Sequence, residues 1–137
     1  MRRKPCLSLV FAASVLASHA ACAEDKVDCA NAVSTADLNA CASRDFDAAD
    51  ATLNAVYKKI TADFAGDEHE YSENNKKWVE ALRASQRAWV AFRDADCEKL
   101  KIFEAGGGSA TTGEVLGCMT EMTDARTKAL KERYEIP

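Results

Sequence analysis

The sequence predicts an all-α fold, an antiparallel bundle of about three long helices stapled by two disulfides. Apolar residues recur at intervals of three and four over long stretches, which is the spacing of one helix face. No stretch shows the strict alternation of a half-buried strand. Glycines break the helical pattern at position 66 and at positions 106–108, so the chain divides into three helical segments.

The first residues have the pattern of a secretory signal peptide. Basic residues at positions 2–4 precede an apolar run over 7–17, and residues 21–23 read Ala-Cys-Ala, a small-x-small cleavage pattern. The apolar run is too short to span a bilayer, and no later stretch is apolar for long enough. We therefore expect residues 1–23 to be removed and residues 24–137 to form one helical domain, in the periplasm or secreted.

Cys22 offers a lipoprotein alternative, in which this cysteine becomes the lipidated first residue. The preceding His19-Ala20-Ala21 lacks the branched apolar residue that such a site usually contains. A soluble exported protein therefore ranks first.

The mature chain is expected to be acidic. Cleavage after Ala23 leaves 114 residues and removes three of the 18 basic residues but none of the 22 acidic ones, so the formal charge changes from −4 to −7. An acidic surface repels phosphates, which argues against nucleic-acid binding. The same charge is compatible with a cationic protein partner.

Four cysteines remain after cleavage, Cys29, Cys41, Cys97 and Cys118. An even set in an oxidising compartment predicts two disulfides, for which three pairings exist. We expect the neighbouring pairs, Cys29 with Cys41 and Cys97 with Cys118, because they close short loops that fit the helix boundaries. Zinc is the rival interpretation, but no spacing is of the close CxxC type and His69 is the one histidine of the mature chain. We predict no metal site and no cofactor.

The first helix is expected to begin at Ser34 or Thr35, whose hydroxyl can cap it, with Asp37 in the favourable first turn. Apolar residues then recur at helical spacing as far as Phe64, without an intervening Pro or Gly. Gly66 is the expected stop, which makes this helix roughly 45 Å long.

The second helix is clear from Trp78 onward. Asp67 and Glu70 have the spacing of a capping box for an earlier start, although the polar run 72–77 is equally compatible with a loop. The helix should end at the Gly-Gly-Gly-Ser run of 106–109, because a glycine costs about 1 kcal/mol in a helix relative to alanine.

The third helix is expected to start at a second capping box, formed by Thr111 and Glu114, and to continue almost to the C-terminus. On this layout Cys97 and Cys118 lie on either side of the glycine run. Their disulfide would therefore join the second and third helices.

Polar side chains interrupt the apolar face of each expected helix. An arginine on a buried face needs a carboxylate, and Asp50 is the suitable one, with Arg93 or Arg126 as its donor. Trp89 lies one turn from Arg93 and is placed to stack on it. We interpret these residues as a structural network that sets helix register, because a buried charge without full pairing is costly. Its members are Asp50, Asn54, Gln86, Trp89, Arg93 and Arg126.

Enzyme chemistry is not indicated. No Ser, Cys or Lys has an evident base beside it, His69 lies in a polar stretch, and no glycine pattern resembles a phosphate loop. Asp94 and Asp96 lie on different helix faces and are interpreted as a solvated acidic edge. We predict that the protein is not an enzyme.

These residues together resemble the LprI family, whose members are exported helical proteins named for the inhibition of lysozyme. The most specific match is Gln86-Arg87-Ala88-Trp89, followed by Phe92-Arg93-Asp94 and Cys97. The resemblance covers nearly all of the mature chain, although Ser85 stands where the family pattern has Ala. The further matching residues are Asp37-Leu38-Asn39-Ala40-Cys41, Asp50, Leu53-Asn54, Tyr57, Leu82-Arg83, Cys118, Thr123, Arg126 and Leu130.

The resemblance implies a protein that binds a cationic muramidase and occludes its substrate cleft, with the helices as a scaffold for a protruding loop. The alternative is a periplasmic binding or scaffold protein of the cell envelope with no lysozyme target. An exposed apolar patch around Met119 and Met122 of the third helix would favour that alternative. The two candidate partner-binding loops are the segment from Gly106 to Gly113 and the connection from Asp67 to Asn75. Their candidate contact residues are Gly106, Gly107, Gly108 and Ser109 in the first, and Glu68 and Glu70 in the second.

Overall fold

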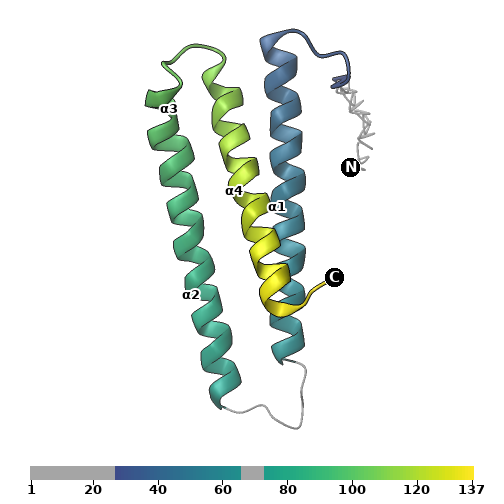
Figure 1. Ribbon diagram of the computed structural model, residues 1–137, viewed down its shortest axis with the longest axis vertical. Helices are drawn as coiled ribbons and strands as arrows, with labels where there is room; N and C mark the ends of the chain where they lie inside the picture. Colours follow the sequence, from purple (N-terminus) through teal and green to yellow (C-terminus); the bar gives the residue numbers. More distant parts are fainter. Residues whose placement is uncertain (1–26, 66–72) are drawn as a thin grey trace, which may run out of the picture.

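The computed structural model describes residues 27–65 and 73–137, so the expected signal peptide lies outside the described residues. Figure 1 shows the second helical stretch running antiparallel to the first and last helices. The described residues contain no strand, and the all-α prediction is confirmed. Their elements are α1 (Thr35–Ala65), α2 (Glu73–Ala95), a π-helical segment η1 (Asp96–Leu100), α3 (Lys101–Glu104) and α4 (Thr111–Tyr134).

The start of α1 agrees with its sequence. The Ser34 hydroxyl donates to the Asp37 carboxylate over 2.7 Å and accepts from the Asp37 backbone N–H over 3.1 Å. This contact satisfies an amide group that the first turn of a helix leaves without an intrahelical partner. The 31 residues of α1 contain neither Pro nor Gly, which explains why the helix is unbroken.

The second helical stretch contains a feature that its sequence does not indicate. Between α2 and α3 the chain forms one π-helical segment, η1, where a continuous α-helix was expected. Cys97 lies in this segment, is fully buried and is bonded to Cys118 of α4. A π-helical turn holds more residues than an α-turn, so it changes the direction in which the following side chains point.

The turn between α3 and α4 consists of the expected glycines. Residues 106–108 have φ angles of 74°, 82° and 92°, which only glycine adopts without strain. The capping box predicted at Thr111 and Glu114 is wrong, because Ala110 precedes α4 without a side-chain cap and the Glu114 N–H donates to the Ala110 carbonyl oxygen over 3.3 Å. The Thr111 hydroxyl is buried and has no hydrogen-bond partner among the described residues.

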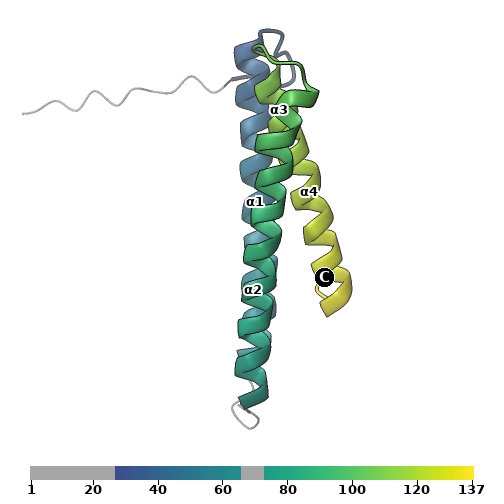
Figure 2. The same ribbon diagram turned by 90° about the vertical axis from the view of Figure 1, so that its left-hand side faces the viewer.

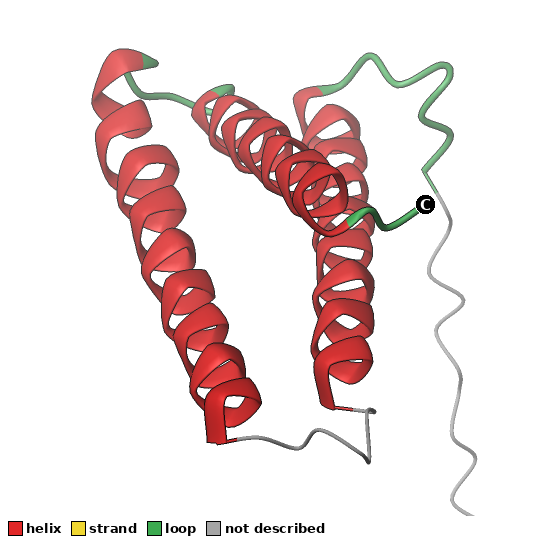
Figure 3. Ribbon diagram, turned by 60° about the horizontal axis from the view of Figure 1, so that its bottom comes forward, coloured by secondary structure: helices red, strands yellow, loops and turns green. Residues whose placement is uncertain are grey.

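The core is built from all three long helices. Leu53, Val56 and Ile60 of α1 form one buried cluster with Leu82 of α2 and Leu130 of α4. Figures 2 and 3 show α4 on one side of the plane that contains α1 and α2, and α4 inclines away from that pair toward its C-terminus. Within the described residues, no helix combines the length and the apolar character that crossing a membrane requires.

An aromatic cluster holds the helices together at the end where α1 stops and α2 begins. Phe64 of α1 stacks on Trp78 of α2 with 3.7 Å between ring centroids. Tyr134 of α4 meets both rings edge-on, at 6.1 Å from Phe64 and 5.5 Å from Trp78. The edge-on geometry of the two Tyr134 contacts is favourable for aromatic pairs.

Both expected disulfides are present, and both lie at the opposite end of the bundle, where α3 turns into α4 (Figure 1). The pair Cys29–Cys41 ties the N-terminal arm to α1, and Arg44 contacts the Cys29 sulfur from the next turn of that helix. The pair Cys97–Cys118 joins η1 to α4. Two covalent links therefore stabilise this end of the bundle.

Candidate functional site

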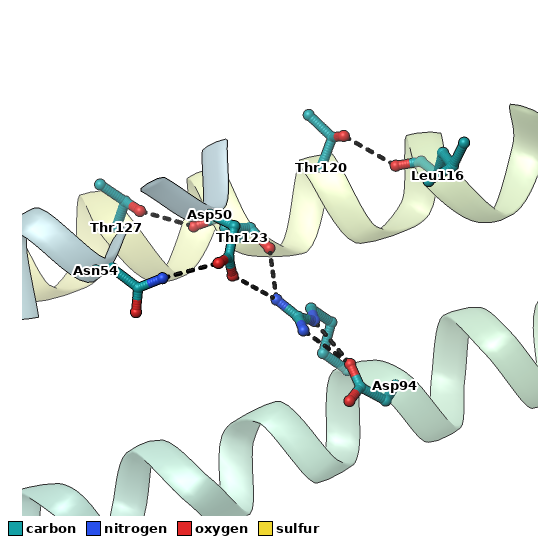
Figure 4. A network of polar contacts seen from close by, with 8 residues as sticks. Asp50, Asn54, Asp94, Leu116, Thr120, Thr123 and Thr127 are labelled. Carbon is teal, nitrogen blue, oxygen red and sulfur yellow. Dashed lines mark hydrogen bonds and ion pairs between the residues drawn. The ribbon is translucent and has the colours of Figure 1, made fainter. Parts of the chain in front are cut away.

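Arg93 is the centre of a polar network that spans the three long helices (Figure 4). Its side chain is only 6% exposed, and Nη1 donates to the Asp50 carboxylate over 3.4 Å and to the Thr123 hydroxyl over 3.2 Å. Asp50 also accepts a hydrogen bond from the Asn54 amide over 2.8 Å. Of the two arginines proposed as the donor to Asp50, the structure places Arg93 there and Arg126 elsewhere.

Asp94 is paired within this network while its side chain is still 37% exposed, so the expectation that only solvent contacts this carboxylate is wrong. Its carboxylate accepts from Nε of Arg93 over 3.0 Å and from Nη2 over 2.9 Å. The two contacts form the fork-like pairing that a guanidinium group favours. The reason is local, because the guanidinium of Arg93 folds back onto the next residue of its own helix while its remaining nitrogen reaches α1 and α4.

Arg126 makes a second, smaller set of contacts. Its Nε donates to Gln86 Oε1 over 3.1 Å, and Nη2 is 3.5 Å from the Ser85 hydroxyl. Trp89 faces both guanidinium groups, with its ring centroid 5.2 Å from Cζ of Arg93 and 5.9 Å from Cζ of Arg126. Burial is the main cause that lowers the pKa of Arg126.

The network has the chemistry of a structural brace. Each of the helices α1, α2 and α4 contributes a polar group to Arg93, and an error in helix register would break these contacts. The described residues include no histidine, so the network contains no pairing of a nucleophile with an imidazole base.

A second candidate site, not identified from the sequence, lies where η1 and α3 meet α4. A cleft of about 460 Å³ is lined there by four carboxylates and by Lys101. The Lys101 ammonium is 3.9 Å from a carboxylate oxygen of Glu104 and equally far from one of Glu114, so both ion pairs are long. The cleft therefore has an excess of negative charge that attracts cations. The four residues of this acidic cleft are Asp96, Glu104, Glu114 and Glu121.

A signal for half of this acidic cleft exists in the sequence. Glu114 and Glu121 are seven residues apart, so they lie on one face of a helix. Their approach to Asp96 and Glu104 depends on how the π-helical segment and α3 are oriented against α4. Sequence spacing does not determine that orientation.

The glycine turn, residues 106–109, connects the two walls of the acidic cleft. Asn39 of α1 holds its end, because the Asn39 amide donates to the Ser109 carbonyl oxygen over 3.2 Å. α4 also approaches α1 closely here, since a Cβ atom on Gly113 would be 3.2 Å from Asn39 Oδ1. Gly113 belongs to α4 and not to the loop. Glu68 and Glu70 of the other candidate loop lie outside the described residues.

One group of side chains has the proximity that a metal site requires. Asp96, Cys97 and Cys118 place possible ligand atoms within 4.8 Å of one another. Both sulfur atoms are bonded to each other as a disulfide, so neither is a thiolate that could bind zinc. We assign no metal to this group.

The methionines of α4 do not form an exposed apolar patch. Met119 is 5% exposed, and the Met122 sulfur is 3.4 Å from the Cys97 sulfur. Exposed apolar side chains lie instead along the second helical stretch, where Phe92 is 59%, Leu100 53% and Phe103 84% exposed. The exposed apolar patch expected around Met119 and Met122 is therefore not found, and exposed apolar side chains lie on the stretch from α2 to α3.

Comparison with known proteins gives one family match and one close relative. The family described as "Lysozyme inhibitor LprI" matches residues 27–130. A protein of Rhizobium meliloti (strain 1021) that is named as uncharacterized is 40% identical over 134 residues, which cover 96% of this chain and 94% of the relative. No solved structure matches the chain. The matched residues include both the polar network and the acidic cleft.

Proposed function

The chain belongs to the LprI family, which is described as a family of lysozyme inhibitors, and on that premise we propose that it is an exported protein that binds a cationic muramidase and occludes its substrate cleft. In this proposal residues 1–23 are the signal peptide and residues 24–137 are the exported domain. The partner is a protein, and the chain itself performs no catalysis, which agrees with the description of the family as inhibitors.

The acidic cleft is the observation that carries the proposal. Four carboxylates and one ammonium group line the cleft, which gives the tip of the bundle a negative potential. A cationic muramidase would be steered toward this tip during diffusion, and its lysine or arginine side chains would find carboxylates there. The polar network offers no such contact, because its central arginine is buried.

The glycine turn gives the tip a part that can enter an enzyme cleft. Residues 106–109 are exposed and lie at one extreme of the bundle (Figure 1). Two disulfides and the hydrogen bond from Asn39 hold the surrounding segments in place. A tip that is already ordered loses little conformational entropy on binding, which favours affinity.

The direct test is lysozyme activity on a cell-wall substrate with increasing amounts of the oxidised mature protein. We expect dose-dependent inhibition at nanomolar to micromolar protein. Inhibition should weaken between low and physiological salt, since salt screens the attraction between exposed charges. The absence of inhibition for several lysozyme types would contradict the proposal.

A pair of charge-reversal variants locates the binding surface. Glu114→Lys with Glu121→Lys should weaken inhibition at least about tenfold, because both charges of the α4 wall change sign. The matched control is Asp63→Lys with Glu132→Lys, which changes the net charge equally at exposed carboxylates that also form lysine ion pairs. An equal loss of inhibition in both variants would show that net charge, and not the acidic cleft, determines binding.

The exposed apolar residues favour a second candidate function, an envelope scaffold that binds another protein through a helical face. Phe92, Leu100 and Phe103 are each more than half exposed. Large exposed apolar side chains can mark a protein interface. Phe92→Ser with Phe103→Ser should leave lysozyme inhibition unchanged if this surface serves a different partner, and a loss of inhibition would assign the surface to the muramidase.

A further inference from the structure

A long groove lies between α1 and α2, away from the acidic cleft. It consists of two adjoining cavities of about 490 Å³ and 430 Å³ that share Arg83 in their walls. All the residues that line it come from α1 and α2, while α4 packs on one side of this pair of helices (Figure 3). These volumes lie in the usual range of ligand sites. We define this α1–α2 groove by Asn54, Tyr57, Lys58, Arg83, Gln86 and Arg87.

The α1–α2 groove is cationic, although the chain as a whole has a formal charge of −4. Basic side chains line it from both helices, and Glu80 is the one carboxylate in its lining. The side chains of Lys58, Arg83 and Arg87 make no hydrogen bond or ion pair with the described residues. Guanidinium groups without a partner are suited to bidentate pairing with carboxylates. The groove therefore favours an anionic ligand.

Two amide side chains in the groove are held in place with half of their hydrogen-bonding capacity unused. Asn54 donates its Nδ2 to Asp50, and Gln86 accepts from Arg126 with its Oε1. This leaves Asn54 Oδ1 as an acceptor and Gln86 Nε2 as a donor, both without a partner among the described residues. The apolar face of a partner helix would cover these atoms without satisfying them, which is unfavourable.

Sugar chains carry hydrogen-bonding groups that can pair with the unpaired polar atoms of this groove. Hydroxyl and acetamido groups both donate and accept hydrogen bonds, so they match the free oxygen of Asn54 and the free nitrogen of Gln86. The half-buried ring of Tyr57 supplies a flat apolar surface against which the C–H face of a sugar can pack. The elongated shape of the groove suits a linear chain.

We propose that the α1–α2 groove binds a glycan strand of N-acetylated sugars that carries carboxylates. Arg83 and Arg87 pair with the carboxylates, and Asn54 and Gln86 bind the neutral sugar groups. No residue lines both this groove and the acidic cleft. The protein can therefore hold such a strand while the acidic cleft is free to bind a muramidase.

The test is co-sedimentation of the oxidised mature protein with insoluble glycans. Purified peptidoglycan supplies N-acetylated sugars with carboxylates, and chitin supplies N-acetylated sugars without them. We expect the protein to sediment with peptidoglycan and to remain in solution with chitin. Equal sedimentation with both polymers, or with neither, would overturn the proposal. Binding to phosphate-rich lipopolysaccharide in place of peptidoglycan would also overturn it, because the ligand charge would then be phosphate.

Variants of the groove separate this proposal from simple charge attraction. Arg83→Gln with Arg87→Gln should weaken sedimentation with peptidoglycan at least about tenfold, because two charge-assisted contacts are lost. Lys99→Gln with Lys128→Gln is the matched control, since it removes the same charge from exposed positions outside the groove. An equal loss in both variants, or no loss in the groove variant, would refute the assignment.

Lysozyme inhibition supplies an independent readout. The groove variant should inhibit a sensitive lysozyme as the unsubstituted protein does, because the acidic cleft is unchanged. The unsubstituted protein could inhibit lysozyme and yet fail to sediment with peptidoglycan. That result would overturn the proposed glycan site and leave the proposed lysozyme inhibition intact. Circular dichroism of each variant checks that the helices are intact.

Discussion

Removal of Arg93 should be the most damaging single change in the polar network. The Arg93→Ala variant loses the hydrogen bond to the fully buried Thr123 and the contacts to Asp50 and Asp94. It also loses two aromatic contacts, since Cζ of Arg93 is 5.2 Å from the ring centroids of both Phe46 and Trp89. The perturbation therefore removes contacts between α2 and both other long helices.

The expected loss is about 3 kcal/mol in the free energy of unfolding. The contact with buried Thr123 contributes about 1.5 kcal/mol. The two carboxylates are 42% and 37% exposed, so solvent screens them and together they add about 1 kcal/mol. The aromatic contacts add roughly 1 kcal/mol more. The variant no longer has to bury a charged guanidinium group, and this gain offsets part of the summed loss. A loss of this size is a large fraction of the stability of a small domain.

Urea unfolding, followed by circular dichroism and tryptophan fluorescence, measures this loss. Lys59→Ala is the control, because it removes a basic residue from an ion pair that is about half exposed and should cost less than about 0.5 kcal/mol. Arg93→Met keeps much of the apolar stem and should cost less than Arg93→Ala. If Arg93→Ala were no more destabilising than Lys59→Ala, the network would contribute nothing to stability, and the reasoning would be refuted.

Three further predictions concern the ends of the bundle. Replacing both Cys97 and Cys118 by Ser should reduce the free energy of unfolding by roughly 3 kcal/mol, because the unfolded chain regains the entropy of a loop spanning 21 residues; equal urea midpoints with and without the bond would contradict this. Gly107→Ala should cost about 1 kcal/mol through backbone strain alone, since its φ is 82° and nothing lies within 4 Å of the added Cβ; a stabilised variant would show that the turn relaxes. A hydrogen bond from Asn31 is the main cause that holds the pKa of Asp28 below the usual 3.8. The contact therefore stabilises the fold fully above pH 3.8, and this stabilisation is lost as the pH falls through the lowered pKa. Carboxyl NMR titration checks it, and a midpoint at or above 3.8 would contradict the contact.

The helices themselves were predictable because their signals are local. The hydroxyl of Ser34, the glycines of 106–108 and the recurrence of apolar residues act within one or two turns of the chain. The neighbouring disulfide pairs followed from the same boundaries, since each pair closes a short segment. The capping box expected at Thr111 and Glu114 shows the limit of this reasoning. In the folded chain the Glu114 N–H bonds to the Ala110 carbonyl oxygen, and no side chain caps α4.

The candidate sites depended on how the helices are rotated against one another. From sequence, Asp50 had two possible arginine partners. In the structure Arg93 lies beside it, while Arg126 contacts Gln86. The acidic cleft and the α1–α2 groove each join side chains from different helical elements that pack against one another. Local periodicity fixes which residues share a face of one helix, whereas packing fixes which faces meet. The sequence alone therefore determined a braced helical bundle, and the tertiary structure decided where its negative and positive surfaces lie.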